Sequence, residues 1–246
     1  MGSLTAHSFI IRITMKEISI KHFFDISKKD YVLSLITEPS SLEKKITEPH
    51  LHRPGLALTG YYERFPYQRI QLLGETEINY LQTLQEDVLY DRLNEIMSFN
   101  IPCFIVSKGL SVPSQMEFLA NEMNIAILVS RLSTEKLYWQ LSRFLRDYFA
   151  PEQSIHATLV EVFGVGILLS GRSGIGKSEC ALELIERKHR LITDDVVKLK
   201  LQEDKLYGTS SKDIGHFMEI RGVGIIDVER MFGIEAIRKE TKIDIQ

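Results

Sequence analysis

One short segment restricts what this chain can fold into more than any other feature. Gly171-Arg172-Ser173-Gly174-Ile175-Gly176-Lys177-Ser178 matches G-x-x-x-x-G-K-[ST], the phosphate-binding loop or P-loop. Its glycines permit the positive φ angles that turn backbone N–H groups toward an anion. An apolar run precedes the loop and an amphipathic stretch follows it. The segment therefore predicts a strand, a loop and a helix in that order.

The fixed polar residues of the loop have expected tasks. Lys177 would bridge the β- and γ-phosphates of ATP, and Ser178 would offer its hydroxyl to Mg²⁺. The positive end of the following helix would stabilise the anion further. The alternative is a glycine-rich turn that binds nothing. A P-loop indicates a nucleotide but does not specify a reaction.

The pair Asp194-Asp195 follows the strand-like run Leu191-Ile192-Thr193, which comes after the predicted P-loop helix. Carboxylates at the end of such a strand are expected to reach the nucleotide cleft. Adjacent residues on an extended segment face opposite ways, so one carboxylate can hold Mg²⁺ or its water while the other handles a substrate proton. The competing interpretation is a polar strand exit with both carboxylates solvated.

Two domains of mixed α/β class are predicted. Helical and strand-like segments alternate from about residue 79 to 149, with strands expected at Pro102 to Val106 and Ile125 to Val129. The segment 150–154 breaks this rhythm, and the runs Thr158 to Phe163 and Gly166 to Leu169 after it predict a hairpin that turns at Gly164-Val165. We therefore expect an N-terminal α/β domain over residues 1–150 and a P-loop domain over 151–246.

Composition excludes several function classes. The formal net charge of −3 gives no overall basic field for nucleic acid or anionic lipid. No apolar run approaches the roughly 18 residues that a bilayer-spanning helix needs. The N-terminus lacks the pattern of a secretory signal, and only Cys103 and Cys180 are available to pair. A cytoplasmic setting without nucleic-acid or membrane partners is expected.

Four blocks in one order resemble the HPr kinase/phosphorylase family. They are His156, the segment 171–179, the run from His189 to Asp195, and Glu219-Ile220-Arg221-Gly222-Val223-Gly224-Ile225-Ile226-Asp227-Val228. Residues 53–61 and 69–74 are similar to the N-terminal domain of that family. The resemblance covers about residues 30 to 240. It implies a catalytic domain with an α/β fold like that of phosphoenolpyruvate carboxykinase.

The resemblance also implies an activity and its partners. The family phosphorylates a serine of HPr, the phosphocarrier of the bacterial sugar phosphotransferase system that regulates carbon metabolism, using ATP and Mg²⁺. In reverse, inorganic phosphate attacks the phosphoserine and pyrophosphate leaves. The family assembles as a homohexamer. The sequence contains neither the H-R-D nor the D-F-G signature of eukaryotic protein kinases.

Site roles follow from the resemblance residue by residue. Lys177 matches the phosphate-contacting lysine, Ser178 a Mg²⁺ ligand, Glu219 a second Mg²⁺ ligand, and His156 an active-site histidine. One aspartate corresponds to the group that takes the serine proton; Asp195 is favoured and Asp194 is the alternative. Without the resemblance, His156 and Glu219 read as ordinary structural or solvated residues, and Gly222 and Gly224 as a bulge or tight turn.

The sequence departs from the family pattern at several positions. Arg172 stands where the family usually has an acidic residue, Ala157 where a glycine follows the histidine, and Thr193 where a small apolar residue precedes the aspartates. The family also continues beyond the position of Gln246 with elements used in catalysis and dephosphorylation. A shortened product, an expressed piece or a variant with impaired phosphorylase activity would each account for this.

Two further hypotheses remain from the sequence. The same site chemistry would serve a P-loop phosphotransferase with a small-molecule acceptor. It would also serve a nucleotide-binding or assembly module without turnover.

Overall fold

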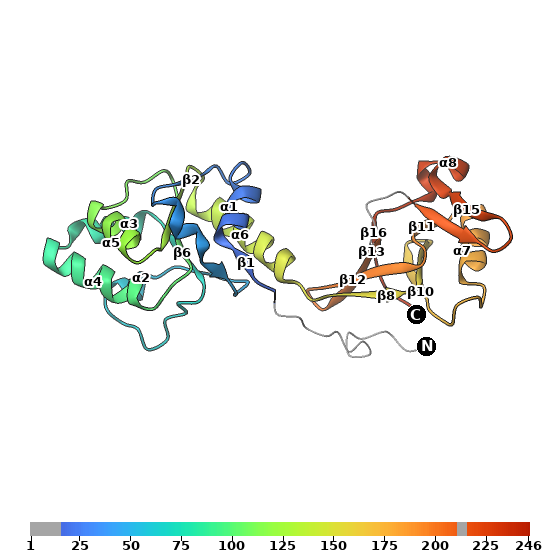
Figure 1. The fold of residues 1–246 in the computed structure, drawn as a ribbon, viewed down its shortest axis with the longest axis horizontal. Coiled ribbons are helices and arrows are strands. Elements are labelled where there is room, and N and C mark those ends of the chain that lie inside the picture. The colour runs from blue at the N-terminus through green and yellow to red at the C-terminus, as the bar shows by residue number, and fades with distance from the viewer. Residues whose placement is uncertain (1–15, 211–215) are drawn as a thin grey trace. The chain divides into compact units, whose positions relative to one another are not determined.

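The chain divides into two compact units, each with its own strands, helices and core (Figure 1). The computed structural model describes residues 16–210 and 216–246, so residues 1–15 of the predicted N-terminal domain lie outside it. One unit comprises Met15–Phe149, and the other, in the described residues, Ala150–Gln246. No helix in these described ranges is long and apolar enough to cross a bilayer.

The N-terminal unit is built on a mostly parallel sheet. Its strands are β1 (Ile18–Ser19), β2 (Leu33–Leu35), β3 (Lys45–Ile46), β4 (Leu51–His52), β5 (Ile70–Leu73), β6 (Cys103–Val106) and β7 (Ala126–Ser130). Its helices are α1 (Ile20–Ser27), α2 (Gly55–Leu58), α3 (Glu75–Thr83), α4 (Glu86–Ser98), α5 (Ser114–Glu122) and α6 (Thr134–Phe149), with a 3₁₀ turn, η2, at Pro39–Glu43. The sheet order is β2-β7-β6-β5-β4, in which only β2 runs antiparallel to its neighbour, and β1 pairs with β3 separately.

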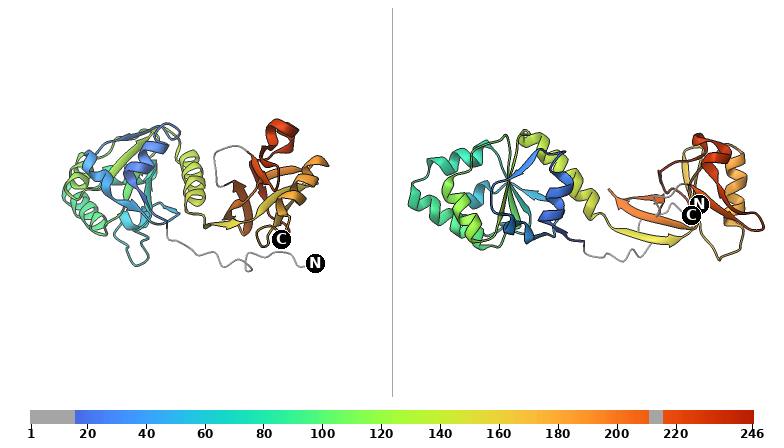
Figure 2. Two further views of the ribbon diagram at one scale, coloured as in Figure 1. Left: turned by 45° about the vertical axis from the view of Figure 1, so that its right-hand side comes forward. Right: turned by 45° about the horizontal axis from the view of Figure 1, so that its top comes forward.

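Helices cover both faces of this sheet, as Figure 2 shows. Along β6, Phe104 and Val106 pack into the core that includes residues of α2 to α5, whereas Cys103 and Ile105 pack into the core that includes residues of α1 and α6. A strand buried on both faces has to be apolar throughout, which is why the runs in β6 and β7 are continuous and not alternating. The two strands predicted at Pro102 to Val106 and Ile125 to Val129 are confirmed to within one residue.

The C-terminal unit is dominated by antiparallel strands. These are β8 (Glu152–His156), β9 (Thr158–Val162), β10 (Val165–Leu169), β11 (Arg190–Thr193), β12 (Val196–Gln202), β13 (Lys205–Ser210), β14 (Phe217–Ile220), β15 (Gly224–Asp227) and β16 (Glu240–Lys242). Its helices are α7 (Lys177–Glu186) and α8 (Val228–Phe232), with a 3₁₀ turn, η3, at Ile234–Ala236. The sheets have the orders β10-β9-β11, β16-β13-β12-β8 and β14-β15. The mixed α/β class predicted for the chain is confirmed.

Successive side chains of β9 and β11 point to opposite faces of the sheet, and they divide the core of this unit into two layers. Leu159 and Ile192 pack into a cluster with residues of β12 and β13, and Val160 and Leu191 pack into a second cluster with residues of α7 and β14. The three-stranded sheet is therefore buried on both faces. Its one side holds the P-loop helix, and its other side holds the four-stranded sheet.

The chain divides between Phe149 and Ala150, within one residue of the boundary predicted at 150/151. Residues from Glu152 onward already form β8, which pairs with β12. One local prediction was wrong. The hairpin turn lies one residue earlier than predicted, at Phe163-Gly164, because Val162 pairs with Val165. Both turn residues have positive φ, 51° and 82°, which matches the twist of a two-residue hairpin loop.

The pair of strands that carries the candidate site passes from one sheet into the next. Only Ala157 separates β8 from β9, and only Asp194 and Asp195 separate β11 from β12. β9 pairs with β11 and β8 with β12, and the Ala157 N–H donates to the Asp195 carbonyl at 3.0 Å between them. A strand pair that passes from one sheet into another forms a corner between the two sheets. Asp194 and Asp195 lie at this corner.

The last strand is held against the three-stranded sheet by close packing and by charge. A Cβ atom at Gly166 would lie 1.9 Å from the Lys242 carbonyl oxygen, so only glycine allows this approach of the backbones. Nearby, the buried Glu161 carboxylate accepts from Thr241 Oγ1 at 3.1 Å and pairs with Arg238 and with Arg190. These contacts join β9 to the end of the described chain.

Candidate active site

The P-loop connects β10 to α7, as the motif predicts. Gly174 and Gly176 have φ angles of 79° and 101°, in the left-handed region that favours glycine. An added Cβ at Gly174 would meet nothing within 4 Å, so the backbone angle and not crowding requires glycine there. Gly176 caps α7 without any side-chain hydrogen bond to the first turn. The N–H groups of that turn are therefore available to an anion.

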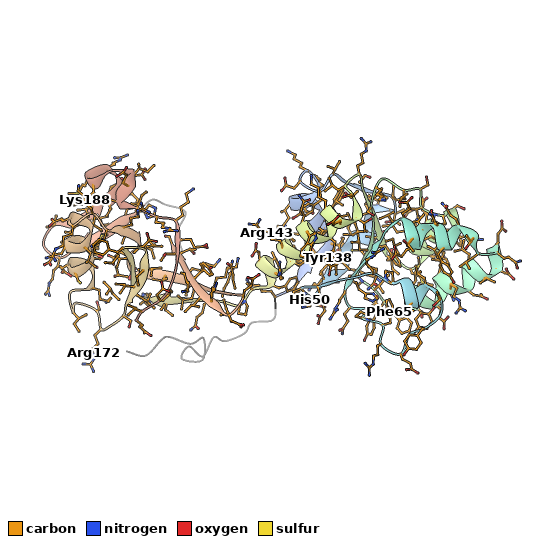
Figure 3. All side chains as sticks on the ribbon, turned by 180° about the vertical axis from the view of Figure 1, so that it is seen from behind. His50, Phe65, Tyr138, Arg143, Arg172 and Lys188 are labelled. Atoms are coloured by element: carbon orange, nitrogen blue, oxygen red, sulfur yellow. The ribbon has the colours of Figure 1, made fainter. Side chains whose placement is uncertain are left out.

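Lys177 is the first residue of α7, and its side chain folds back over the loop. Its Nζ donates to the carbonyls of Gly171 and Arg172, each at 3.3 Å. The ammonium thus lies at the mouth of the loop. A bound phosphate would replace the two carbonyls as its partner and would form stronger, charge-assisted hydrogen bonds with it. Arg172 itself is exposed, and Figure 3 shows its side chain extending outward from the unit. Ser173 and Ile175, the remaining loop positions, are also exposed.

Asp194 faces the P-loop helix. Its Oδ1 accepts a hydrogen bond from Ser178 Oγ at 3.1 Å. The Ser178 hydroxyl has one proton, and because that proton is directed to Asp194, the oxygen lone pairs remain for another ligand. The two predicted residues are thereby brought together at the start of α7.

Asp195 faces the other way, toward His156. Its Oδ1 lies 3.5 Å from His156 Nδ1, and both side chains are largely exposed, 71% for Asp195 and 86% for His156. The backbone at Asp195 has φ 72°, which is unusual for a residue with a side chain and turns the chain at the corner between the sheets. The expectation that the two carboxylates diverge agrees with this geometry.

Glu219 lies in the middle of β14, opposite Ile225, with its side chain exposed. In residues 16–210 and 216–246 no group of three His, Cys, Asp or Glu side chains is arranged to hold a metal ion. The structure brings Ser178 and Asp194 together without Glu219, whose role as a metal ligand stays a prediction. Gly222, with φ 83°, lies in the tight turn that joins β14 to β15.

Ser178 in the first turn of α7 and Asp194 after β11 suit Mg²⁺ in their chemistry. Ser178 offers a hydroxyl oxygen and Asp194 a carboxylate oxygen, the hard donors that this ion prefers. Mg²⁺ keeps several waters and is bound through one or two carboxylates plus the phosphates of the nucleotide. A complete cage of protein ligands is therefore unnecessary, and the donor set fits the ion.

Sequence reasoning did not identify Thr158 as part of this site. Its Oγ1 lies 2.6 Å from Asp194 Oδ1, and the residue is fully buried. In the sequence it reads only as the first residue of an apolar run. Its register with β11 decides its neighbour, and a single sequence does not reveal that register.

Comparison with known proteins places both units in one family. Residues 18–145 match the family model described as HPr Serine kinase N terminus, and residues 147–246 match the HPr Serine kinase C-terminal domain. The HPr kinase/phosphorylase of Brevibacillus brevis is 40% identical over 232 residues, which are 94% of this chain and 73% of that protein. The HPr kinase/phosphorylase of Lactobacillus johnsonii is 45% identical over 204 residues, 82% of this chain and 64% of that protein.

Similarity to solved structures includes the following protein, over a smaller part of the chain. The Hpr(Ser) kinase/phosphatase from Coxiella burnetii is 37% identical over 37% of this chain and 55% of that chain, with a TM-score of 0.36. The family assignment depends on the matches over the sequence: two family models that together span both units, and relatives named as enzymes at about 40% identity. The chain therefore belongs to the HPr kinase/phosphorylase family.

Proposed function

We propose that this protein transfers the γ-phosphoryl group of ATP, bound with Mg²⁺ at the P-loop, to a serine hydroxyl of HPr, and that it removes the same group by phosphorolysis. The observation that carries the proposal is the divergence of Asp194 and Asp195, one toward Ser178 and the other toward His156. This separates a carboxylate suited to the metal from one suited to a proton. Relatives named HPr kinase/phosphorylase support the choice of HPr as the acceptor.

Each residue has a defined task in the forward reaction. The N–H groups at the start of α7 and the Lys177 ammonium bind the β- and γ-phosphates, and Ser178 and Asp194 would hold Mg²⁺. Bound there, Mg²⁺ would neutralise part of the phosphate charge. As the bond from the serine oxygen to the γ-phosphorus forms and the bond to the β-phosphate oxygen breaks, Asp195 accepts the serine proton. Phosphoryl transfer requires mainly this positioning and charge neutralisation.

The reverse reaction uses the same groups. Inorganic phosphate occupies the position of the β-phosphate and attacks the phosphoserine, so that a phosphorus–oxygen bond to the serine breaks and pyrophosphate leaves. Asp195 returns the proton to the serine oxygen. His156, whose Nδ1 lies 3.5 Å from Asp195 Oδ1, would hold this carboxylate in either direction.

Exposure favours a protein acceptor over a small molecule. A small-molecule site buries most of the surface of its ligand. Here the side chains of Asp195 and His156 are 71% and 86% exposed, so the proton acceptor is open to the surface of the unit. A serine on the surface of another protein can approach such a carboxylate directly.

Transfer of labelled phosphate from ATP to HPr tests the proposal. With Mg²⁺ present, we expect phosphoserine on HPr in the wild-type protein, and release of pyrophosphate when phosphorylated HPr is incubated with inorganic phosphate. Small hydroxyl compounds are tested in parallel as acceptors, and Lys177→Ala serves as the control for P-loop chemistry. Bound ATP without phosphoserine on HPr would overturn the kinase assignment, and transfer to a small acceptor alone would replace it.

The proposal extends to assembly and location. We infer a homohexamer that acts in the cytoplasm on carbon metabolism, as the family resemblance implies. The two cysteines are free, with Cys103 buried and Cys180 exposed, which is compatible with a reducing compartment. Light scattering on the eluted protein measures its mass in solution, and a monomer at micromolar concentration would contradict the hexamer.

A further inference from the structure

Thr158 forms the shortest hydrogen bond of the candidate active site in the part of the chain that the structure describes. Its Oγ1 lies 2.6 Å from Asp194 Oδ1. A carboxylate accepts hydrogen bonds and a threonine hydroxyl has one proton to donate, so Thr158 is the donor. Since Thr158 is fully buried, its hydroxyl would be costly to leave without a partner.

A bulge in β11 creates this contact. Arg190 pairs with Glu161 and Leu191 with Val160, but Thr193 pairs with Leu159, so the register shifts by one residue between Leu191 and Thr193. Continued by one residue, the shifted register sets Asp194 opposite Thr158. The bond from the Ala157 N–H to the Asp195 carbonyl fits the same register. Without the bulge, Thr193 would lie opposite Thr158, and the side chain of Asp194 would be directed elsewhere.

Two hydroxyls therefore meet one oxygen of Asp194. Oδ1 accepts from Thr158 at 2.6 Å and from Ser178 at 3.1 Å. Within residues 16–210 and 216–246, both hydrogen bonds of the Asp194 carboxylate go to Oδ1, which leaves Oδ2 for a cation or its water. Thr158 is fully buried in β9, whereas Ser178 is half-buried in the first turn of α7, the helix expected to accommodate the nucleotide. Thr158 is thus the contact that fixes the carboxylate before anything binds.

We propose that Thr158 is a positioning residue for Mg²⁺: its hydroxyl holds Asp194 in the orientation that presents one carboxylate oxygen to the cation beside Ser178. This rests on the proposed function, since it assumes that Mg²⁺ and a nucleotide bind at the start of α7. Residues that orient a metal ligand without touching the metal typically change metal affinity by about 10- to 100-fold when they are replaced.

Binding of a non-hydrolysable ATP analogue, titrated with Mg²⁺, tests the proposal without turnover. Thr158→Val keeps the shape and removes the hydroxyl, and it should raise the Mg²⁺ concentration for half-maximal enhancement of binding by about tenfold. Binding measured in EDTA should stay within about twofold of wild type, because the phosphate contacts of the loop are untouched. Thr158→Ser restores the hydroxyl and should restore the wild-type Mg²⁺ dependence.

Thr193→Val is the matched control. Thr193 is also buried and precedes Asp194, but its hydroxyl contacts the backbone carbonyls of Asp194 at 3.4 Å and Val196 at 3.3 Å and the Ser210 hydroxyl at 3.4 Å, and not the Asp194 carboxylate. We expect no change in Mg²⁺ dependence from it. In an Asp194→Asn background, Thr158→Val should add less than about a twofold effect, because residues that act through one contact are not additive.

The outcomes separate this inference from the proposed function. If the wild-type protein shows no Mg²⁺-dependent binding of the analogue, the proposed function fails and the role of Thr158 fails with it. If the wild type binds normally and Thr158→Val has an unchanged Mg²⁺ dependence, only the role of Thr158 is overturned. The role of Thr158 would likewise be overturned if Thr158→Val lost the same affinity for the analogue in EDTA as in Mg²⁺, or if Thr158→Ser behaved like Thr158→Val. Either result would indicate a structural role.

Discussion

Asp194 and Asp195 are consecutive in the sequence, but their carboxylates face different neighbours. Asp194 Oδ1 accepts from Ser178 Oγ at 3.1 Å, whereas Asp195 Oδ1 lies 3.5 Å from His156 Nδ1. The positive φ of 72° at Asp195 turns the chain between them, at the corner where the strand pair changes sheets. The two carboxylates therefore have different surroundings, and substituting them should have different effects.

Asp195→Asn should stop phosphoryl transfer and spare nucleotide binding. Asparagine tolerates the left-handed backbone of this position, so the fold is kept while the proton acceptor is lost. We expect transfer to HPr to fall by about 10²- to 10⁴-fold. Binding of an ATP analogue with Mg²⁺, measured by calorimetry, should change by less than about twofold.

Asp194→Asn should mainly weaken Mg²⁺-dependent nucleotide binding and should affect phosphoryl transfer only through it. It weakens the cation site next to Ser178, and the Mg²⁺ requirement for binding should rise by about 10-fold or more. Transfer should partly recover when Mg²⁺ is raised. If instead Asp194→Asn abolishes transfer at every Mg²⁺ concentration and Asp195→Asn leaves transfer intact, the roles of the two residues are exchanged.

Lys177→Ala should weaken binding of ATP in the forward reaction and of inorganic phosphate in the reverse reaction. The ammonium, now 3.3 Å from the Gly171 and Arg172 carbonyls, would lose its charge-assisted contacts with phosphate, worth about 1.5–3 kcal/mol or roughly 10- to 150-fold in affinity. Arg187→Ala is the control, since it removes a cation after the last residue of α7, where its pair with Glu183 is exposed. Equal effects of the two variants would show that bulk charge and not the loop contact is responsible.

Gly166→Ala should destabilise the C-terminal unit. The added Cβ would lie 1.9 Å from the Lys242 carbonyl oxygen, so β10 and the end of β16 would have to separate. Overpacking of this kind costs about 1–3 kcal/mol. The matched control is Gly55→Ala in the N-terminal unit, where the nearest atom, Glu77 Oε1, is 3.9 Å away. Hydrogen exchange of β10 amides reports the difference, and unchanged protection would contradict the predicted clash.

Acid should destabilise the N-terminal unit through His52. Burial lowers the pKa of His52 from its ordinary value of 6.5, and the ring packs on Phe65 with Nδ1 2.9 Å from Gln71 Oε1. The folded unit therefore binds a proton less readily than the unfolded chain does. The stabilisation is fully present above pH 6.5 and declines as the pH falls below that value toward the lowered pKa.

Urea unfolding followed by tryptophan fluorescence measures this effect, because the single tryptophan of the chain, Trp139, lies in α6 of the same unit. The free energy of unfolding should decline between neutral pH and pH 5, a window chosen to bracket the ordinary histidine value of about 6.5. The decline should be smaller in His52→Asn. An identical pH profile in the two proteins would exclude His52 as the cause.

Local patterns sufficed for part of the site. The P-loop, its strand and its helix follow from glycine positions and apolar periodicity, which act over a few residues. The strands β6 and β7 were predicted for the same reason. The turn at Phe163-Gly164 was predicted one residue away, since either glycine-containing pair there is compatible with a hairpin and only the pairing of Val162 with Val165 selects one.

The sequence by itself determined the motif, the α/β class and the family of this protein, because these depend on residue types at fixed spacing. Tertiary structure decided which residues meet. The bulge between Leu191 and Thr193 sets Thr158 opposite Asp194, and the turn at Asp195 directs its carboxylate to His156. Strand register is fixed by burial of both faces of a sheet across residues far apart in the chain, and a one-residue shift moves every side chain to the other face.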